Sequence, residues 1–548
     1  MQNNSPSGTP PEKPSGDGGQ GGPTATASNV THTGATTLSE TASIDAQTYA
    51  SVTGGENALL VTAGEVTLNS PTVTKSGDES SEDSDFYGTN AAVLATGGVI
   101  NINGGSVETS GAHANGIFAY GDGKIVVKNT TVKTTSNNSG GIMFTGGGYL
   151  EAENVTVTTA GNSSAPIRSD RGGGTMTVTG GSFTSNGIGS PAIYSTADIN
   201  VSGAALTSTS SEGVVIEGSN SVHLENVTLT DTNNSLNGNS ETYKNIFIYQ
   251  SMSGDASEGT GTFSANNSTI TTNQGDTFFV TNTTANISLE NNRIVNNDAS
   301  SAFLRAQSGK WGTAGANGGI VKLSLTKQVA EGDIVLDSVS SLSLVLSDQS
   351  FYMGIINGAN TAQSIDVTLD ATSQLILAGD SYINTLTNAD STNMNIYSNG
   401  YKLYVAGSEV EINGSEAPEV PEASESTTGI KDWKEAIDSG DDSRTLCLDE
   451  GGCGTNYAPF IVGGIALLVI IGAIVAFVIH NKKKKGGPTQ GDSVISPDGS
   501  MTTPGAPADA RPDFSQFDDD PVQQPTQPSQ PQPQPQPPRQ QPPLVGRM

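Results

Sequence analysis

The sequence contains few of the side chains on which most enzymes, metal sites and nucleic-acid-binding proteins depend. Its 548 residues include only 2 cysteines and 4 histidines. No Cys/His cluster has the spacing of a zinc site, and no Cys–His or Ser–His pair has local support for nucleophilic catalysis. Acidic residues outnumber basic ones by 55 to 24, and the net charge of −31 repels a phosphate backbone. The sequence therefore predicts no metal site, no cofactor and no nucleic-acid partner.

Large apolar side chains are also scarce. Hydrophobic residues make up 34% of the chain and aromatic residues 5%, against 67 glycines. A compact globule of this length would be unusual with such a composition. A chain of this kind either stays disordered or folds as a repetitive β structure, in which a thin core needs few large side chains. The periodicity of the middle of the chain favours the repetitive β structure.

One pattern returns along the middle of the chain: an apolar pair, a Gly-rich turn, an alternating strand, an Asn or Gly, and another short strand. The spacings between its first apolar positions are 25, 25, 25 and 26 residues, and these positions are Ala92, Ile117, Ile142, Ile167 and Ile193. Such constant spacing predicts a structural period.

Asparagine or glycine occupies one aligned turn position in every repeat. The members are Gly104, Asn129, Asn154, Gly180, Gly203, Asn226, Asn267 and Asn291. These residue types enter the left-handed α region at the lowest cost, so they predict one corner per turn. The amides of stacked corners, such as Asn154 and Asn226, would form an internal ladder rather than glycan acceptors. Sequons in expected loops, such as those at Asn29, Asn162 and Asn413, could carry glycans.

A period near 25 residues with three short strands per turn predicts an all-β fold, the parallel β-helix solenoid, over residues 41–410. At a strand spacing of about 4.8 Å, this segment would hold roughly eleven to thirteen coils. An array of β-sandwiches is the alternative, but it would need a period of roughly 90 to 100 residues. The long interval between Asn226 and Asn267 indicates loops that leave the solenoid.

Several runs within this segment carry a resemblance to a known family. They are SDRGGG (169–174), SPAIYSTADI (190–199), IYQSMSGDA (248–256), FFVTNTTANISL (278–289) and WGTAGANGG (311–319). They resemble the right-handed parallel β-helix surface proteins of anaerobic microbes, which have the pectin-lyase-like fold and are known mainly as adhesin-like proteins. The resemblance covers roughly residues 55–410 and implies a right-handed solenoid with an adhesin-like role. The apolar run and the Pro/Gln-rich tail described below depart from the secreted or wall-linked members of that family.

The regions that flank the repeats have different compositions. Residues 1–40 are rich in Pro, Gly and Ser and predict a disordered arm, without the basic and apolar regions of a secretory signal. Residues 411–458 are acidic and predict an extended stalk. Residues 481–548 predict a disordered tail whose Pro/Gln repeats could bind an SH3- or WW-type adaptor; a merely solvated tail is the alternative.

Residues 459–480 predict a single transmembrane α-helix. The run from Phe460 to Ile479 has no charge, and at about 1.5 Å per residue it is long enough to cross a hydrocarbon layer of roughly 30 Å. Four lysines follow at 482–485, so the positive-inside rule predicts a cytoplasmic tail and an ectodomain outside the plasma membrane. Cys447 and Cys453 would close a small disulfide loop outside the membrane, with two free thiols as the alternative.

Strand alternation predicts an apolar stripe on the outside of the solenoid. If the repeat isoleucines point inward, the outward residues are Phe118, Met143, Arg168, Tyr194, Val215, Ile248, Phe279 and Leu304. Exposed apolar surface usually contacts a partner, so a glycan or protein ligand is expected there. The candidate ligand-binding residues are Phe118, Met143, Arg168, Tyr194, Ile248 and Phe279. The alternatives are that a chain segment covers the stripe or that the alternation is reversed.

No catalytic residue is predicted. Arg168, Asp170 and Arg171 superficially resemble the basic residue and acidic calcium ligands of pectate-lyase relatives, but too few carboxylates converge around them. A salt-linked turn is the favoured interpretation. The sequence thus favours a membrane-anchored surface protein for adhesion or recognition. A surface polysaccharide lyase or hydrolase is the alternative, and a structural coat protein is a third possibility.

Overall fold

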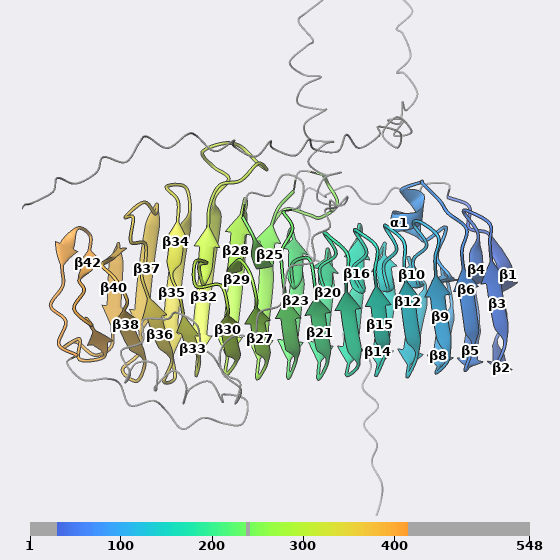
Figure 1. The fold of residues 1–548 in the computed structure, drawn as a ribbon, viewed down its shortest axis with the longest axis horizontal. Helices are drawn as coiled ribbons and strands as arrows, with labels where there is room; N and C mark the ends of the chain where they lie inside the picture. The colour runs from blue at the N-terminus through green and yellow to red at the C-terminus, as the bar shows by residue number, and fades with distance from the viewer. Residues whose placement is uncertain (1–29, 237–241, 252, 415–548) are drawn as a thin grey trace, which may run out of the picture. The chain divides into compact units, whose positions relative to one another are not determined.

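The computed structural model describes residues 30–236, 242–251 and 253–414. Within these residues the chain forms a stack of short strands, parallel except for the last pair, and one short helix, α1 (Asp83–Tyr87) (Figure 1). Three long sheets of 12, 14 and 10 strands, called sheets A, B and C, run along the stack. Successive strands along the chain pass from A to B to C and then return to A, which makes one turn of a solenoid.

Within each long sheet, the strands stack in the order in which they follow one another along the chain. Sheet A contains β1 (Gly34–Leu38), β4 (Asn57–Val61), β7 (Val93–Ala95), β10 (Ile117–Tyr120), β13 (Ile142–Thr145), β16 (Ile167–Asp170), β19 (Ile193–Ser195), β22 (Val214–Glu217), β25 (Lys244–Tyr249), β28 (Asp276–Thr281), β31 (Leu304–Ala306) and β34 (Ile334–Leu336). Sheet B contains β2 (Ala42–Asp45), β5 (Glu65–Asn69), β8 (Val99–Asn103), β11 (Lys124–Lys128), β14 (Tyr149–Glu153), β17 (Thr175–Thr179), β20 (Asp198–Ser202), β23 (Ser221–Glu225), β26 (Thr260–Asn266), β29 (Thr283–Glu290), β32 (Gly319–Thr326), β35 (Ser341–Ser347), β37 (Ser364–Leu369) and β40 (Thr385–Asn388). Sheet C contains β3 (Thr48–Ser51), β6 (Thr72–Lys75), β9 (Ser106–Thr109), β12 (Thr131–Thr134), β15 (Thr156–Thr159), β18 (Ser182–Ser185), β21 (Ala205–Ser208), β24 (Thr228–Asp231), β27 (Thr269–Thr272) and β30 (Arg293–Asn296).

Two smaller sheets continue the stack toward the C-terminal end. The first has four strands, β33 (Val329–Glu331), β36 (Phe351–Gly354), β38 (Gln374–Leu377) and β41 (Ile396–Tyr397). The second has three strands, β39 (Ser381–Ile383), β42 (Leu403–Val405) and β43 (Ser408–Glu409). The solenoid is right-handed and has about 15 turns. The predicted parallel β-helix is therefore confirmed, and the expected number of coils is slightly low.

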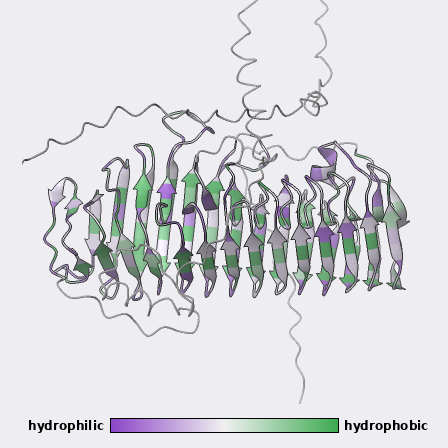
Figure 2. Ribbon diagram, in the orientation of Figure 1, coloured by the Kyte–Doolittle hydropathy of each residue, from purple (hydrophilic) through white to green (hydrophobic). Residues whose placement is uncertain are grey.

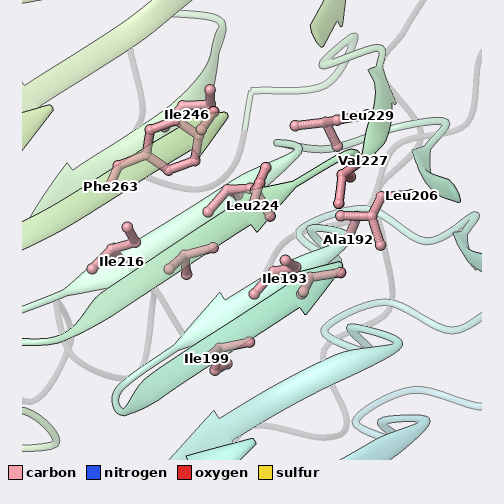
Figure 3. Close-up of a cluster of buried hydrophobic side chains, with 14 of the residues drawn as sticks. Ala192, Ile193, Ile199, Leu206, Ile216, Leu224, Val227, Leu229, Ile246 and Phe263 are labelled. Carbon is pink, nitrogen blue, oxygen red and sulfur yellow. The ribbon is translucent and has the colours of Figure 1, made fainter. Parts of the chain in front are cut away.

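Each turn buries a few apolar side chains in the same positions. Ile117 lies opposite Ile142, which lies opposite Ile167, and all three are fully buried. Figure 2 shows hydrophobic segments recurring along successive strands, and Figure 3 shows side chains from three sheets meeting in the interior, among them Ile193, Ile199 and Leu206. Because every turn repeats this small cross-section, a chain with 34% hydrophobic residues can still form a continuous core.

The first spacing predicted from the sequence is wrong by one residue. Val93, not Ala92, lies opposite Ile117 in the sheet A ladder. The turn between β7 and β8 is one residue shorter than the turn between β10 and β11, which makes the first spacing 24 residues.

The eight predicted corner residues all adopt positive φ angles, from 49° at Asn267 to 72° at Gly104. Backbone hydrogen bonds connect successive corners to the next turn, for example from Asn129 N to Glu153 O at 2.9 Å. However, the expectation of an internal amide ladder is wrong, because Asn129, Asn154 and Asn226 are exposed to solvent. Within this column, Asn291 Nδ2 donates a hydrogen bond to Asn267 Oδ1 at 2.6 Å. The corner residues thus determine the backbone conformation at each turn, and the side chains of the exposed asparagines face outward.

Several predictions fall on residues outside the described part of the chain. These are residues 1–29 of the predicted arm over 1–40, residues 415–458 of the predicted stalk over 411–458, the disulfide of Cys447 and Cys453, the transmembrane helix over 459–480 and the tail over 481–548. The remainder of the predicted arm contains β1, so the solenoid begins earlier than residue 41. In the part of the chain that the structure describes, no helix has the length and apolarity needed to cross a membrane.

Candidate functional site

Three insertions lie over the outer face of sheet A. The first, residues 76–92, precedes β7 and contains α1; the second, residues 250–259 without Met252, follows β25; the third, residues 307–318, follows β31. Figure 1 shows α1 and the yellow-green connection before β32 along the upper side of the stack. We refer to these segments as the first, second and third insertions.

The predicted outward residues are not exposed. Phe118, Met143 and Arg168 are 0% exposed, and Tyr194 and Phe279 are 4% and 7% exposed. Phe118, Met143, Arg168 and Tyr194 do lie in one register on sheet A. The expectation of an open apolar stripe is nevertheless wrong, because the insertions pack on this face, which is the first of the two alternatives that the sequence left open.

Two residues were assigned to the wrong side of sheet A. Phe247, not Ile248, lies opposite Val215, and Arg305, not Leu304, lies opposite Phe279. Ile248 and Leu304 belong to the interior core. The turns after β22 differ in length, so counting from one repeat to the next shifted the alternation by one residue.

Arg168 is the centre of a buried network of charged groups. Its Nη2 donates to Asp170 Oδ2 at 3.0 Å, and its Nη1 lies 3.7 Å from Asp85 Oδ1 in the first insertion. The other oxygen of Asp85 lies 2.9 Å from His113 Nδ1. One guanidinium is therefore shared by two carboxylates, and a sheet strand and α1 are joined through it.

The backbone of the first insertion is also bonded to the sheet. Thr145 Oγ1 donates to Phe86 O at 2.6 Å, and Asn115 Nδ2 donates to Ser84 O at 3.1 Å. The guanidinium carbon of Arg171 lies 3.6 Å from the centre of the Phe86 ring, a cation–π contact. The first insertion is thus held to sheet A by hydrogen bonds, charge and ring contacts together.

The second insertion is held by two acidic side chains. Arg171 Nε donates to Asp255 in this insertion. Glu217, at the end of β22, is 1% exposed and accepts hydrogen bonds from Tyr194 Oη at 2.7 Å and Tyr249 Oη at 2.9 Å. Ser251 Oγ in the second insertion also donates to Glu217. Glu217 therefore joins the second insertion to three turns of the solenoid.

An aromatic cluster holds the third insertion. Trp311 lies with its ring centre 5.0 Å from that of Tyr249 and 6.2 Å from that of Phe247. Phe247 stacks on Tyr249 at 4.4 Å and meets Phe279 edge-on at 5.7 Å. Such ring pairs contribute about 0.5 to 1.5 kcal/mol each beyond the area that they bury.

Burial raises the pKa of several acids in this network. It raises the pKa of Asp170 to about 7, although the charge of Arg168 opposes this shift. It also raises the pKa of Glu217, with a further contribution from Asp255 and opposition from the hydroxyl donors. Burial alone would lower the pKa of His113, but the charge and hydrogen bond of Asp85 raise it above its ordinary value. The closed face therefore favours the protonated forms of these groups.

A second buried charge pair lies near the aromatic cluster. Lys244 Nζ is 3.6 Å from Glu212 Oε1, and both side chains are less than a tenth exposed. Burial lowers the pKa of Lys244. Sequence patterns did not identify Asp85, Glu217, Asp255 or this pair. A signal for Asp85 and Asp255 was present, since both lie in the long connections between repeats.

The chemistry of the site is that of a packed interface. Arg168 and Asp170 form an ion pair, as expected for the predicted salt-linked turn, but both lie in strand β16 rather than in a turn. Arg171 pairs with Asp255. Among the residues described, no group of three or more His, Cys, Asp or Glu side chains is placed to hold a metal ion. Comparisons with protein-family models, curated proteins and solved structures found no match to the chain. The fold assignment thus depends on the strand register, and the adhesin-like family remains a prediction.

Proposed function

We propose that the chain is a cell-surface recognition protein, in which the solenoid presents the three insertions to a glycan or protein ligand. The observation that carries this proposal is that Arg168 and Arg171, close together at β16, bind acids from two insertions far apart in the sequence, Asp85 and Asp255. The insertions are therefore fixed side by side on one face of a rigid scaffold.

Fixed insertions suit recognition for an energetic reason. Binding residues are common on loops that a rigid scaffold positions. A loop that is already ordered loses less conformational entropy when it binds, so more of its contact energy appears as affinity. The ion pairs and ring contacts beneath the insertions would supply that order, while the outer side chains of the insertions, such as Asp78, Glu258 and Thr313, remain exposed.

Membrane anchoring is part of this proposal. The uncharged run from Phe460 to Ile479 and the lysines at 482–485 support a single-pass helix with the solenoid outside the plasma membrane and the tail in the cytoplasm. The full chain should stay in the membrane fraction after alkaline carbonate extraction. Release into the soluble fraction would contradict the anchor and would leave the proposal for the insertions untouched. The tail would then be available to an SH3- or WW-type adaptor.

The recognition proposal is tested with full-length chain on an array of neutral and acidic glycans and on cultured cells. The variant Asp78→Arg, Glu258→Arg, Thr313→Arg changes one exposed residue on each insertion. A matched control, Thr72→Arg, Thr177→Arg, Thr228→Arg, changes outward positions of sheets B and C. Binding should be lost in the first variant and kept in the control. Equal binding by both variants, or binding to neither array nor cells, would reject the proposal.

Cleavage of a polysaccharide is the second candidate function. The observation that favours it is the presence of Asp170 and Glu217, two acids with raised pKa values, on the same sheet, in β16 and β22, with β19 between these strands. Both are buried, so the insertions would have to move before a substrate could reach them. Incubation with acidic polysaccharides, with and without calcium, should then release product that Asp170→Asn abolishes. Absence of product from the wild-type chain would exclude this candidate for the substrates tested.

A further inference from the structure

The first turn of the solenoid has unpaired strand edges. Within the described residues, β1, β2 and β3 begin the three sheets, and each is paired on one side, with β4, β5 and β6. A strand at such an edge presents free backbone N–H and C=O groups, which can pair with another strand. Three edges of this kind surround one end of the apolar core.

The first turn contains neither lysine nor proline, two residues by which proteins commonly block strand pairing. Residues 34–51 contain no Lys, Arg or Pro, and their only charged residues are Glu40 and Asp45. Edge strands are normally protected by lysine, proline or a bulge. The chain that leads into β1 runs along the side of the stack, since His32 Nε2 bonds Tyr87 O at 2.8 Å and the His32 ring lies 5.6 Å from that of Tyr120.

The core is incompletely covered at this end. Leu38 and Ile44 pack against the core but are only partly buried, whereas Val61 and Leu68, directly behind them, are 0% and 1% exposed. Val52, just after β3, is 79% exposed.

The opposite end is built differently. There β42 and β43 form an antiparallel pair, and Lys402 Nζ bonds Glu409 Oε2 at 2.8 Å. The rings of Tyr382 and Tyr404 stack at 4.9 Å. A charged antiparallel hairpin is a poor continuation for parallel strands, so the two ends are not complementary to one another.

We propose that the N-terminal end of the solenoid binds the same end of a second copy of this chain. A surface that pairs with three open strands around an apolar centre must have the same cross-section. The same end of another copy has that cross-section. A twofold axis through an edge strand would place that strand antiparallel to its own copy, which is an isologous contact. On a cell surface, such a contact would join molecules end to end. This dimerisation is independent of the ligand proposed for the insertions.

The test measures the mass of the full-length chain in density-matched detergent by sedimentation equilibrium over a range of concentrations. The variant Ser43→Lys, Thr48→Lys places charges on the edge strands. The control Thr67→Lys, Thr72→Lys places them on the residues directly behind, in the second turn. Like charges facing one another weaken strand pairing, so the dimer dissociation constant should rise at least about tenfold in the edge variant. The control should match the wild type.

A cross-linking measurement keeps the proposal testable if the edge variant fails to fold. In a background of Cys447→Ser and Cys453→Ser, Thr37→Cys places a thiol on β1, and Tyr401→Cys places one near the other end. Mild oxidation should give a covalent dimer with Thr37→Cys only. A monomeric wild-type chain, a dimer that the edge variant leaves unchanged, or equal cross-linking from both ends would each overturn the proposal.

Discussion

Ile167 and Arg168 are neighbours in β16, and both are 0% exposed. Ile167 points into the solenoid and contacts other apolar side chains, whereas Arg168 points to the outer face of sheet A and contacts acids. Complete burial of an isoleucine contributes about 1.5 to 3 kcal/mol. Burial of a charge costs several kcal/mol unless partners are in place. The two faces of one strand are therefore buried for opposite energetic reasons.

The difference shows that the two faces of sheet A depend on different features of the sequence. The interior follows from the repeat, because each turn brings an apolar residue to the same position. The outer face of sheet A depends on partners that are distant in sequence, such as Asp85 for Arg168 and Asp255 for Arg171. Substitutions on the two faces should therefore destabilise different parts of the molecule.

The largest effect is expected at Arg168. Arg168→Met leaves Asp85 and Asp170 buried without their shared cation, which should lower the free energy of unfolding by about 3 to 5 kcal/mol. Urea denaturation measures the change, and limited proteolysis should show earlier cleavage in the first insertion. Lys124→Met, at an exposed position of β11, is the control and should change stability by less than about 0.5 kcal/mol. An Arg168→Met variant as stable as this control would show that the network contributes nothing.

A core substitution should cost slightly less and should leave the insertions in place. Ile142→Ala removes buried methyl groups from the interior column and should cost about 2 to 5 kcal/mol. Thr158→Ala, an outward position of β15 that is only partly buried, is the matched control. If Ile142→Ala exposes the first insertion to protease in native conditions as Arg168→Met does, then the two faces are not independent.

The sequence predicted the interior well because its signal is local and repeated. Ile117, Ile142, Ile167 and Ile193 are each fixed by the same short pattern, and one register error at Ala92 did not change the fold. The exposure of the outer face was predicted wrongly because alternation describes only a strand and its neighbours. What covers Phe118 is an insertion with no period. Asp85 in that insertion is identified as the partner of Arg168 only when the chain is folded.

A pH dependence should distinguish the two faces further. The pKa of Asp170 rises from 3.8 to about 7 when the face is closed, so the closed state holds a proton that the open state releases. The stabilisation that Asp170 gives the closed state is therefore fully present below about pH 4 and is lost as the pH rises toward 7. For one proton, the equilibrium constant between the closed and open states changes by at most about tenfold per pH unit. The raised pKa of His113 adds a loss above its ordinary value of 6.5. The acids Glu82, Glu217 and Asp255 and the cation Arg171 also face this network.

Hydrogen exchange at the amides of α1, corrected for the intrinsic effect of pH, measures this dependence. Asp170→Asn cannot titrate, so its exchange should vary less between pH 4 and 7 than that of the wild-type chain. Amides of β12 serve as the internal control, because sheet C does not contact the insertions' ion pairs. A wild-type pH profile that Asp170→Asn leaves unchanged would assign the titration to another group.

The smallest effect is expected at a corner, where backbone conformation alone matters. Asn154 has a φ of 51° and an exposed side chain. Asn154→Ala places a residue with a Cβ and no local amide in the left-handed region and should cost about 1 kcal/mol. Asn154→Gly should be nearly neutral, since glycine occupies the next corner, Gly180, with a φ of 65°. Urea denaturation of the two variants decides between a conformational and a side-chain role. If both variants lose the same stability, the amide itself holds the corner, and the low cost of the left-handed backbone is not the reason for asparagine at this position.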